Sequence, residues 1–343
     1  MAKDTVSIYF ANAAVAHLGA AGRARVLDCA GISAELLAVS QARVPAEAFA
    51  ALWLAVAREL DDEFFGLDSR RMKVGSFALL CNAVLACDSL ERALRQILRG
   101  FTVFLDDVTG HLEVAEGLAR VRIDNRIRNQ ADRLFADETF LTLVHGLVCW
   151  LTGQRIPLAR VEFAHARPAH AREYTLMFSD QVGFGSTASG LAFDAKLLRA
   201  PIVQNAASLR DFLRAAPQSI FLRYRNQDSW TARLRRRLRD VGAGGEIDWP
   251  VFGDLAREFS ITPTTLRRRL DAEGTSYQAI KDALRRDAAI EHLSNSALSV
   301  AEIAHLLGFQ EPSAFHRAFK RWNGVQPGEY RARFGPGQGG ASG

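Results

Sequence analysis

Residues Ala301–Phe319 read AEIAHLLGFQEPSAFHRAF, and their spacing predicts two short helices joined by a tight turn. The small side chain of Ala304 lets the two helices cross closely. Gly308 tolerates the positive φ that such a turn requires. Phe315 and Phe319 lie four residues apart, which places them on one face of the second helix. The stretch therefore predicts a helix-turn-helix motif, whose second helix is the one that enters a groove of DNA.

A looser copy of the pattern lies earlier in the chain. The apolar or small positions that correspond in the two copies are Leu255 and Ile303, Ala256 and Ala304, Ile261 and Phe309, Leu266 and Phe315, and Leu270 and Phe319. The offset is 48 residues up to Phe309 and 49 afterwards, so the second turn contains one extra residue. Ser260 stands where the second copy has Gly308, which is less favourable because serine carries a Cβ. Pro263 and Pro312 both suit the first turn of a helix.

The faces opposite these apolar positions are polar and basic in both copies. The candidate DNA-contacting side chains are Thr264, Arg267 and Arg268 in the first copy, and Ser313, His316, Arg317 and Lys320 in the second. Arginine can bind guanine through two hydrogen bonds, while hydroxyls and lysine suit phosphate. A single such face is more often an ordinary solvated surface. Two matching faces in one chain favour DNA binding, and a tandem pair needs no second subunit to contact two stretches of groove.

The distribution of charge agrees with this prediction. The chain has 43 Lys and Arg against 38 Asp and Glu. From Phe221 onward there are 19 basic and 14 acidic residues, so the whole excess of positive charge lies in the segment with the two motifs. A local basic surplus is what a domain that displaces counterions from phosphates requires. Between the motifs, Tyr277–Leu293 has helical spacing and predicts a connecting helix that fixes their separation.

The region Trp230–Phe334 resembles the double helix-turn-helix domain of the AraC/XylS family of bacterial transcription regulators. The residues that carry the resemblance are Gly308, Phe309, Ser313, Ala314, Phe315, Arg317 to Trp322, Gly324, Pro327, Tyr330 and Arg331. The resemblance implies that Thr264, Arg267 and Arg268 meet DNA in the first motif, and Glu311, Ser313, His316 and Arg317 in the second. Glu311 departs from a helpful pattern, because an acid beside phosphate repels; it could accept from a cytosine amine or cap the helix. The resemblance also implies an activator that recruits RNA polymerase.

The N-terminal two-thirds carries weaker signals. Helices are predicted at Ala11–Cys29, Gly31–Leu37, Pro45–Leu60, Gly75–Ala86, Leu90–Phe101, Asp132–Leu151, Tyr174–Phe178 and Ser208–Ala215. Strands are predicted as a hairpin at His111–Ala115 and Leu118–Asp124, a single strand at Arg160–His165, and a second pair at Gln181–Phe184 and Gly190–Phe193 joined by a hairpin turn. This order is similar to the arabinose-binding-like N-terminal domain of the AraC/XylS subgroup that includes ornithine-utilisation regulators. The resemblance implies a small-molecule effector or a second protomer as partner, without indicating which residues contact it.

The sequence therefore predicts an α+β N-terminal effector domain, with helices around a small sheet, followed by an all-α domain with two helix-turn-helix motifs. The predicted boundaries are 1–215 for the effector or dimerisation domain, 216–229 for a linker, 230–334 for the DNA-binding domain and 335–343 for a disordered tail. The start of the chain lacks the layout of a secretion signal, and no run of eighteen apolar residues predicts a membrane span. A cytoplasmic protein is expected.

Other chemistry is weakly supported. The four cysteines (Cys29, Cys81, Cys87 and Cys149) contain no C-x-x-C pair and are expected to fill cores. His145 and Cys149 lie four residues apart but lack a third ligand, so neither a metal nor a cofactor is expected. An alkylation-repair enzyme with a similar DNA-binding module would need a histidine next to its nucleophilic cysteine, and none is present. A regulator whose N-terminal domain only dimerises, without a ligand, remains an alternative.

Overall fold

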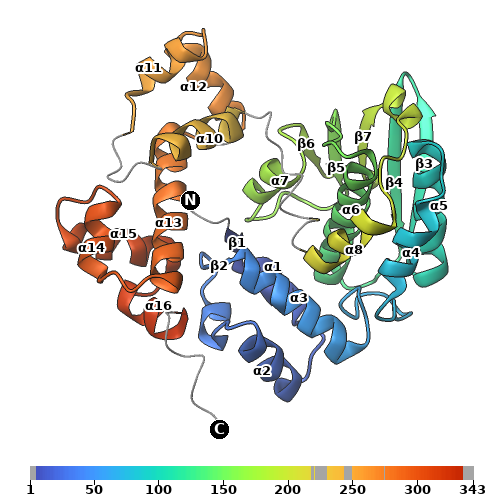
Figure 1. Cartoon of the computed structure of the whole chain (residues 1–343), viewed down its shortest axis with the longest axis horizontal. Helices are drawn as coiled ribbons and strands as arrows, with labels where there is room; N and C mark the ends of the chain where they lie inside the picture. The colour runs from blue at the N-terminus through green and yellow to red at the C-terminus, as the bar shows by residue number, and fades with distance from the viewer. Residues whose placement is uncertain (1–4, 218–219, 221–229, 243–248, 274, 335–343) are drawn as a thin grey trace. The chain divides into compact units, whose positions relative to one another are not determined.

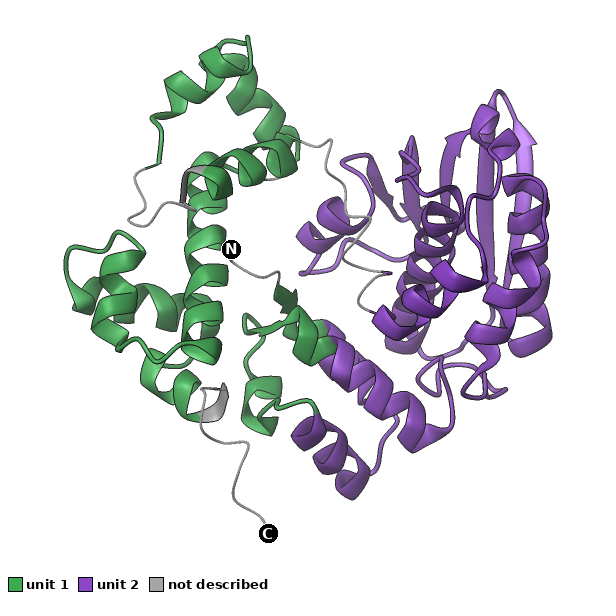
Figure 2. Ribbon diagram, viewed as in Figure 1, with its two compact units in different colours: residues 1–9, 30–49, 227–343 green, residues 10–29, 50–226 purple. Residues whose placement is uncertain are grey.

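The computed structural model describes residues 5–217, 220, 230–242, 249–273 and 275–334. The chain forms two compact units (Figure 2). Unit 1 contains residues 1–9, 30–49 and 227–343, and unit 2 contains residues 10–29 and 50–226. Two N-terminal segments therefore belong to the same unit as the C-terminal helices. No local pattern in the sequence indicates this arrangement, in which segments of the predicted domain 1–215 belong to unit 1.

Unit 2 is built on a five-stranded sheet with the order β3-β4-β7-β5-β6 (Figure 1). Its strands are β3 (Val108–Ala115), β4 (Leu118–Asn125), β5 (Arg160–Phe163), β6 (Val182–Phe184) and β7 (Ser189–Asp194). The helices α5 (Leu90–Phe104) and α6 (Gln130–Thr152) cover one face of the β3–β4 hairpin. At Gly110 of β3, a Cβ atom would meet Leu98 of α5 at 2.7 Å and Phe140 of α6 at 2.8 Å. The close approach of both helices to the sheet thus requires glycine there.

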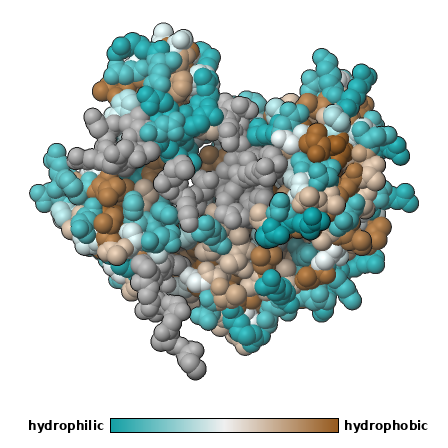
Figure 3. Space-filling model, in the orientation of Figure 1, coloured by the Kyte–Doolittle hydropathy of each residue, from teal (hydrophilic) through white to brown (hydrophobic). Residues whose placement is uncertain are grey.

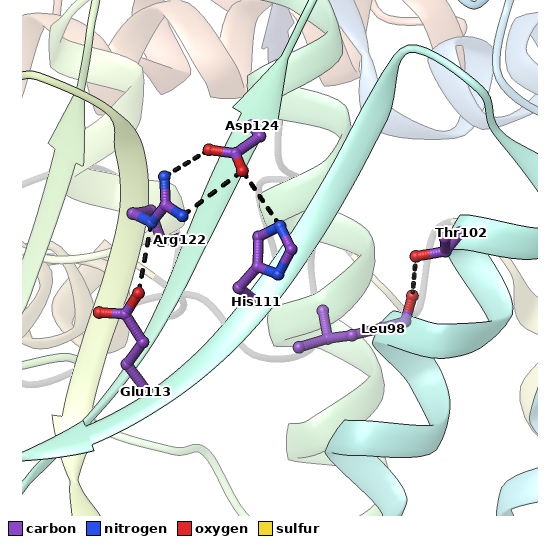
Figure 4. A network of polar contacts seen from close by, with 6 residues as sticks. All are labelled: Leu98, Thr102, His111, Glu113, Arg122 and Asp124. Carbon is purple, nitrogen blue, oxygen red and sulfur yellow. Dashed lines mark hydrogen bonds and ion pairs between the residues drawn. The ribbon is translucent and has the colours of Figure 1, made fainter.

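The other face of the hairpin is charged. Arg122 on β4 pairs with Asp124 and with Glu113 of the neighbouring strand β3, and the Nε2 atom of His111 lies 3.1 Å from a carboxylate oxygen of Asp124 (Figure 4). Alternate residues of β4 point inward and are buried, namely Ala119, Val121 and Ile123. β3 lies at the edge of the sheet, and a row of charged side chains discourages an edge strand from pairing with another chain.

The predicted β3–β4 hairpin is confirmed. Its two-residue turn has positive φ at Glu116 (53°) and Gly117 (75°), as a tight hairpin turn requires. The predicted second hairpin is wrong. β6 runs parallel to β5, whereas β7 pairs antiparallel with both β5 and β4, so β5 lies between the two strands that were expected to pair. Gly190 packs against the backbone of β4, since a Cβ atom there would lie 2.4 Å from the carbonyl oxygen of Val121.

Most predicted helices of the N-terminal region are present. They are α3 (Ala46–Leu60), α4 (Ser76–Val84), α5, α6, α7 (Arg172–Met177) and α8 (Ala206–Ala215), while the expected helix at Gly31–Leu37 is the 3-10 helix η1 (Ala34–Ala38). The single helix predicted at Ala11–Cys29 is instead two, α1 (Ile8–Ala14) and α2 (Ala20–Cys29). Gly19 directly precedes α2, and glycine is a poor helix former. A second 3-10 helix, η2, spans Ala195–Arg199. The predicted tail 335–343 and most of the predicted linker lie outside the described residues.

Unit 1 contains α10 (Trp230–Gly242), α11 (Phe252–Glu258), α12 (Pro263–Ala272), α13 (Tyr277–Asn295), α14 (Val300–Leu306), α15 (Pro312–Asn323) and α16 (Pro327–Phe334). Its N-terminal segments contribute η1 and two strands. β1 (Thr5–Ser7) and β2 (Arg43–Pro45) form an antiparallel pair, with Val6 opposite Val44. These strands are three residues long, too short for a hydrophobic period to predict.

A buried ionic network joins the N-terminal strands to the C-terminal helices of unit 1. Asp287 of α13 accepts a hydrogen bond of 2.7 Å from the hydroxyl of Thr5 and one of 2.6 Å from the guanidinium of Arg235 on α10. The Nε atom of Arg43 donates in turn to the hydroxyl of Thr5 at 2.7 Å. Asp287 is 2 % exposed and Arg43 is 8 % exposed. Four elements, β1, β2, α10 and α13, are thus held around one carboxylate.

Two opposing effects set the pKa of Asp287. Burial would raise the pKa of this carboxyl, but the positive charges of Arg235, Arg286 and Arg43 and the hydrogen bond from Thr5 outweigh it and lower the pKa to about 2. The carboxylate therefore stays ionised within the unit over the whole physiological pH range. An ionised carboxylate inside a protein requires such partners, because an unpaired buried charge is strongly destabilising.

We expect Asp287→Asn to lower the free energy of unfolding of unit 1 by about 3–5 kcal/mol, because removing one partner leaves buried arginines without their counter-charge. The pH dependence should change as well. The folded-state pKa lies below the usual value of about 3.9, so the carboxylate stabilises the fold fully above about pH 4 and loses this effect as the pH falls toward 2.

Urea unfolding of the full chain between pH 2 and pH 7 measures both effects. The control is Asp282→Asn on the same helix, whose carboxylate accepts an exposed hydrogen bond from Gln278. If Asp287→Asn and Asp282→Asn unfold at the same urea concentration, the network is not a source of stability.

Candidate nucleic-acid interface

The two predicted helix-turn-helix motifs are present, with matching backbone geometry. In the first, α11 and α12 are joined by a turn in which the N–H of Ile261 donates to the carbonyl of Ala256 at 3.0 Å. In the second, between α14 and α15, the N–H of Phe309 donates to the carbonyl of Ala304, also at 3.0 Å. The two bonds lie at corresponding positions of the two copies, because Ala256 corresponds to Ala304 and Ile261 to Phe309.

Both turns contain a residue with positive φ at the position that the sequence predicts. Gly308 has a φ of 74° and Ser260 a φ of 56°, so both adopt the left-handed conformation. For serine that conformation is strained, since its Cβ approaches the following carbonyl oxygen. Pro263 and Pro312 begin α12 and α15, as expected.

Apolar side chains anchor each motif from the inside. In the first motif, Leu255, Ala256, Leu266 and Leu270 are at most 1 % exposed and belong to one cluster with residues of α10 and α13. In the second, the ring of Phe315 lies 5.5 Å from that of Phe309 and 5.7 Å from that of Phe319. The polar faces therefore point away from these cores.

On α12, all three predicted DNA-contacting residues are exposed: Thr264, Arg267 and Arg268. The guanidinium carbon of Arg267 lies 5.8 Å from the ring centre of Phe252, a contact that restricts its side chain without burying it. In the view of Figure 3, the surface over α11 and α12 at the top is mostly hydrophilic.

On α15 the predicted residues are exposed with one exception. Glu311, Ser313, Arg317 and Lys320 are exposed, whereas His316 is half-buried and its Nδ1 atom lies 3.3 Å from the amide oxygen of Gln326. Glu311 occupies the N-cap position of α15, but within the described part of the chain its side chain makes no capping hydrogen bond. Its suggested role as a helix cap is therefore wrong, and its carboxylate faces solvent.

A residue that the sequence did not single out connects the two motifs. Arg285 of α13 donates a hydrogen bond of 3.1 Å from Nε to the carbonyl of Leu307, at the end of α14. Its guanidinium carbon also lies 5.0 Å from the ring centre of Trp249, next to the first motif, and 5.3 Å from that of Phe309 in the second. Figure 1 shows α13 running between the motifs. Arg285 thus ties the connecting helix to both.

Helix α10 contains three consecutive arginines, Arg235, Arg236 and Arg237, which differ in their contacts. Arg235 is part of the buried network around Asp287, and Arg237 pairs with Glu258 of α11. Arg236 between them is exposed. Two of the three arginines therefore have protein partners, so the run is mainly structural.

The remaining chemical candidates are buried and neutral. His145 and Cys149 lie side by side, with the Nε2 atom of His145 2.9 Å from the carbonyl oxygen of Ile156. Burial lowers the pKa of His145 to about 4 and raises the pKa of Cys149 to about 12, so both are uncharged at neutral pH. Among the described residues, no group of three His, Cys, Asp or Glu side chains could hold a metal ion.

Comparison with known proteins covers both units. Residues 21–202 match the family described as the arabinose-binding domain of AraC transcription regulator, N-terminal, and residues 255–333 match a helix-turn-helix domain family. The ornithine utilization regulator of Pseudomonas aeruginosa is 29% identical over 262 residues, which is 76% of each chain. An HTH-type transcriptional regulator of Mycobacterium tuberculosis is 30% identical over 290 residues, 81% of each chain. The crystal structure of the transcriptional regulator CdpR of Pseudomonas aeruginosa aligns with 91% of this chain and 97% of its own, at 22% identity and a TM-score of 0.31.

The strained turn of the first motif leads to a prediction. We expect Ser260→Gly to stabilise unit 1 by about 1 kcal/mol, because glycine adopts the left-handed conformation without a Cβ clash. The reverse change, Gly308→Ser, should destabilise it by a similar amount. Equilibrium urea unfolding of the full chain measures both, and a lower midpoint for Ser260→Gly would contradict the prediction.

Proposed function

The chain belongs to the AraC family of transcription regulators, and from this premise we propose that α12 and α15 are the helices that it inserts into operator DNA. It is a DNA-binding transcription regulator with an N-terminal ligand-binding domain. The observation that carries the proposal is the agreement between the two motifs. Thr264 and Ser313, Arg267 and His316, and Arg268 and Arg317 each differ by 49 positions, so the polar faces correspond residue by residue.

The chemistry of these residues suggests a division of roles. Arg268 and Arg317 are exposed on the second helix of each motif, and an arginine there can bind the O6 and N7 atoms of guanine. Thr264 and Ser313 lie at the starts of their helices, where hydroxyls contact phosphate or a base edge. Lys320 suits phosphate. The exposed carboxylate of Glu311 suits the amino group of cytosine.

The fixed connection between the motifs defines the operator. α13 contains 19 residues and carries Arg285, which contacts Trp249 next to the first motif and Leu307 and Phe309 of the second. We propose that this rigid link presents the two recognition helices to successive major grooves on one side of the duplex, about 34 Å apart. One polypeptide would then read a bipartite operator.

Several further features are proposed from the family. Relatives named as activators, such as the urease operon transcriptional activator of Escherichia coli, 36% identical over 78 residues, favour a protein that activates transcription by recruiting RNA polymerase. Unit 2 is proposed to bind a small effector, and it can also provide a dimer interface. A ligand alters transcription only if it binds one state of the protein better than another.

We propose that the protein acts by binding and has no catalytic activity. A DNA-repair alkyltransferase needs a thiolate, whereas burial raises the pKa of Cys81, Cys87 and Cys149. Cys29 is exposed, but no histidine stands next to it in the sequence. A cytoplasmic location is proposed from the family. Among the described residues, one helix, α6, is long and apolar enough to cross a membrane, but its side chains from Phe135 to Thr152 are buried in the protein.

We expect Arg317→Ala to cost about 1–3 kcal/mol of specific operator binding and to relax the preference at one base position, because a base-reading arginine discriminates against the wrong base. Gel-shift titration with a set of operator variants measures this. The control is Arg214→Ala on α8, an exposed arginine of unit 2 that also removes one positive charge. If Arg317→Ala weakens binding to all operator variants equally, Arg317 contacts phosphate instead of a base.

Arg285 allows a test of the rigid link. Operators in which the two half-sites are moved apart by two or three base pairs should bind the native protein with lower affinity. We expect this loss of affinity to be smaller in Arg285→Ala, since the contacts of Arg285 on either side of α13 are lost. Affinity for a single half-site should change little. Arg285→Lys keeps the charge but loses the planar group that stacks on Trp249 and Phe309, so it should behave like Arg285→Ala. Unchanged spacing preference in both variants would contradict the rigid-link proposal.

A further inference from the structure

Unit 2 contains a cluster of polar and aromatic side chains around a buried acid. We call it the acid–aromatic cluster; it consists of Glu138, Phe163, His165, His170, Tyr174 and Phe184. It draws on α6, β5, α7, β6 and the loop after β5, and all of it lies in the segment that matches the arabinose-binding domain family.

The innermost member is a carboxylate. Glu138 is 1 % exposed, and its Oε1 atom accepts hydrogen bonds from the hydroxyl of Tyr174 and, at 2.7 Å, from the Nε2 atom of His170. Removing the charge of an acid from water is costly even with partners, so a buried carboxylate needs a structural or a binding role. A few convergent polar groups among aromatic side chains are the usual composition of a small-molecule site.

Tyr174, which donates to this acid, belongs to a group of three aromatic rings. The rings of Phe163 and Tyr174 are stacked, with centres 4.6 Å apart and an angle of 23°. Phe184 stacks on both, at 5.7 Å from Tyr174 and 6.1 Å from Phe163. Ring faces carry negative charge density, so aromatic rings next to a carboxylate form an environment that attracts cations.

An imidazole nitrogen in the cluster lacks a partner. The Nδ1 atom of His165 donates to the carbonyl of Ala166 at 2.9 Å, which leaves Nε2 as an acceptor in the neutral ring. This Nε2 atom is buried and finds no hydrogen-bond partner among the described residues. The ring centre of His165 lies 5.0 Å from that of Phe163 and 5.9 Å from that of Phe184. A buried acceptor that is unpaired among the described residues can take a hydrogen bond from a bound ligand.

The exposure of the side chains increases from the inside of the cluster to its outer edge. Phe163 and Tyr174 are fully buried, His165 and Phe184 are half-buried, and Arg167 next to them is exposed. The guanidinium carbon of Arg167 lies 5.4 Å from the ring centre of Phe184. The outermost ring of the cluster therefore already binds a cation of the protein itself.

From these observations we propose that the acid–aromatic cluster is the effector site of unit 2 and that its ligand is a small organic amine, bound as a cation. Its ammonium group would lie toward Glu138, with an N–H donated to Nε2 of His165 and its carbon skeleton against Phe184 and Phe163. A carboxylate ligand would be repelled by Glu138. The proposal rests on control of this regulator by an effector, and it adds the site and the chemical class.

The test uses the full-length protein and matched pairs of probes. The amines are 2-phenylethylamine and 1,4-diaminobutane, and the carboxylates of similar shape are 3-phenylpropanoate and butanedioate. We expect at least one amine to raise the melting temperature in a saturable manner, to bind in isothermal titration, and to change the affinity for operator DNA. The carboxylates should do none of these.

Three variants locate the site. Glu138→Gln should weaken amine binding at least tenfold, because it removes the charge and keeps the shape. The control is Glu162→Gln on β5, a half-buried carboxylate paired with Arg160 on the strand face opposite Phe163; it should bind as the native protein does. Arg167→Ala should leave amine binding unchanged or tighter, since it removes a competing cation. If circular dichroism shows that Glu138→Gln does not fold, His165→Phe at the half-buried edge replaces it and should also weaken binding.

The outcomes separate this proposal from the proposed function. Equal amine binding by Glu138→Gln and Glu162→Gln overturns the location. Carboxylate binding that Arg167→Ala abolishes overturns the chemical class and leaves effector control intact. If no amine binds while the operator is still bound specifically, the effector-site proposal fails and the DNA-binding proposal stands.

Discussion

Unit 1 is organised around one buried charge. Asp287 stays ionised only because Arg235, Arg43 and Thr5 surround it, and these residues come from segments separated by most of the chain. Each partner that moved away would leave a charge without compensation in a low-dielectric interior. The requirement fixes α10 and α13 to the N-terminal strands, and α13 is also the helix that links the two DNA-binding motifs. The geometry of DNA recognition therefore depends on residues far from any DNA-contacting surface.

The helices held together by this network support the exposed polar faces of α12 and α15. Arg285 is partly buried between Trp249 and Phe309, whereas Arg268 and Arg317 extend into solvent. The same residue type thus occurs in two settings: Arg285 contacts other parts of unit 1, and Arg268 and Arg317 are exposed. If the proposed rigid link holds, less entropy is lost when both helices bind DNA together.

How much could be predicted from the sequence depended on how local each signal was. The motif turns followed from Gly308, the proline positions and the helical period of Phe315 and Phe319, all within a few residues. The pairing of Arg235 with Asp287 had no local signal, because the two residues lie 52 positions apart. The strands β1 and β2 were missed because three residues carry no period, and the expected β6–β7 hairpin failed because β5 inserts between them. The polar faces were predicted from the sequence, but the acid–aromatic cluster and Arg285 required tertiary contacts.

The position of β1 and β2 has a practical consequence for how this protein can be divided. Ser7 is followed directly by α1 and Pro45 by α3, so the strands that complete unit 1 are covalently continuous with helices of the N-terminal region. A recombinant fragment that starts at Trp230 would lack Thr5 and Arg43 and would expose one side of Asp287 to water. A shorter protein that keeps the structure of unit 1 must therefore include β1 and β2, supplied by fusion or as a separate peptide.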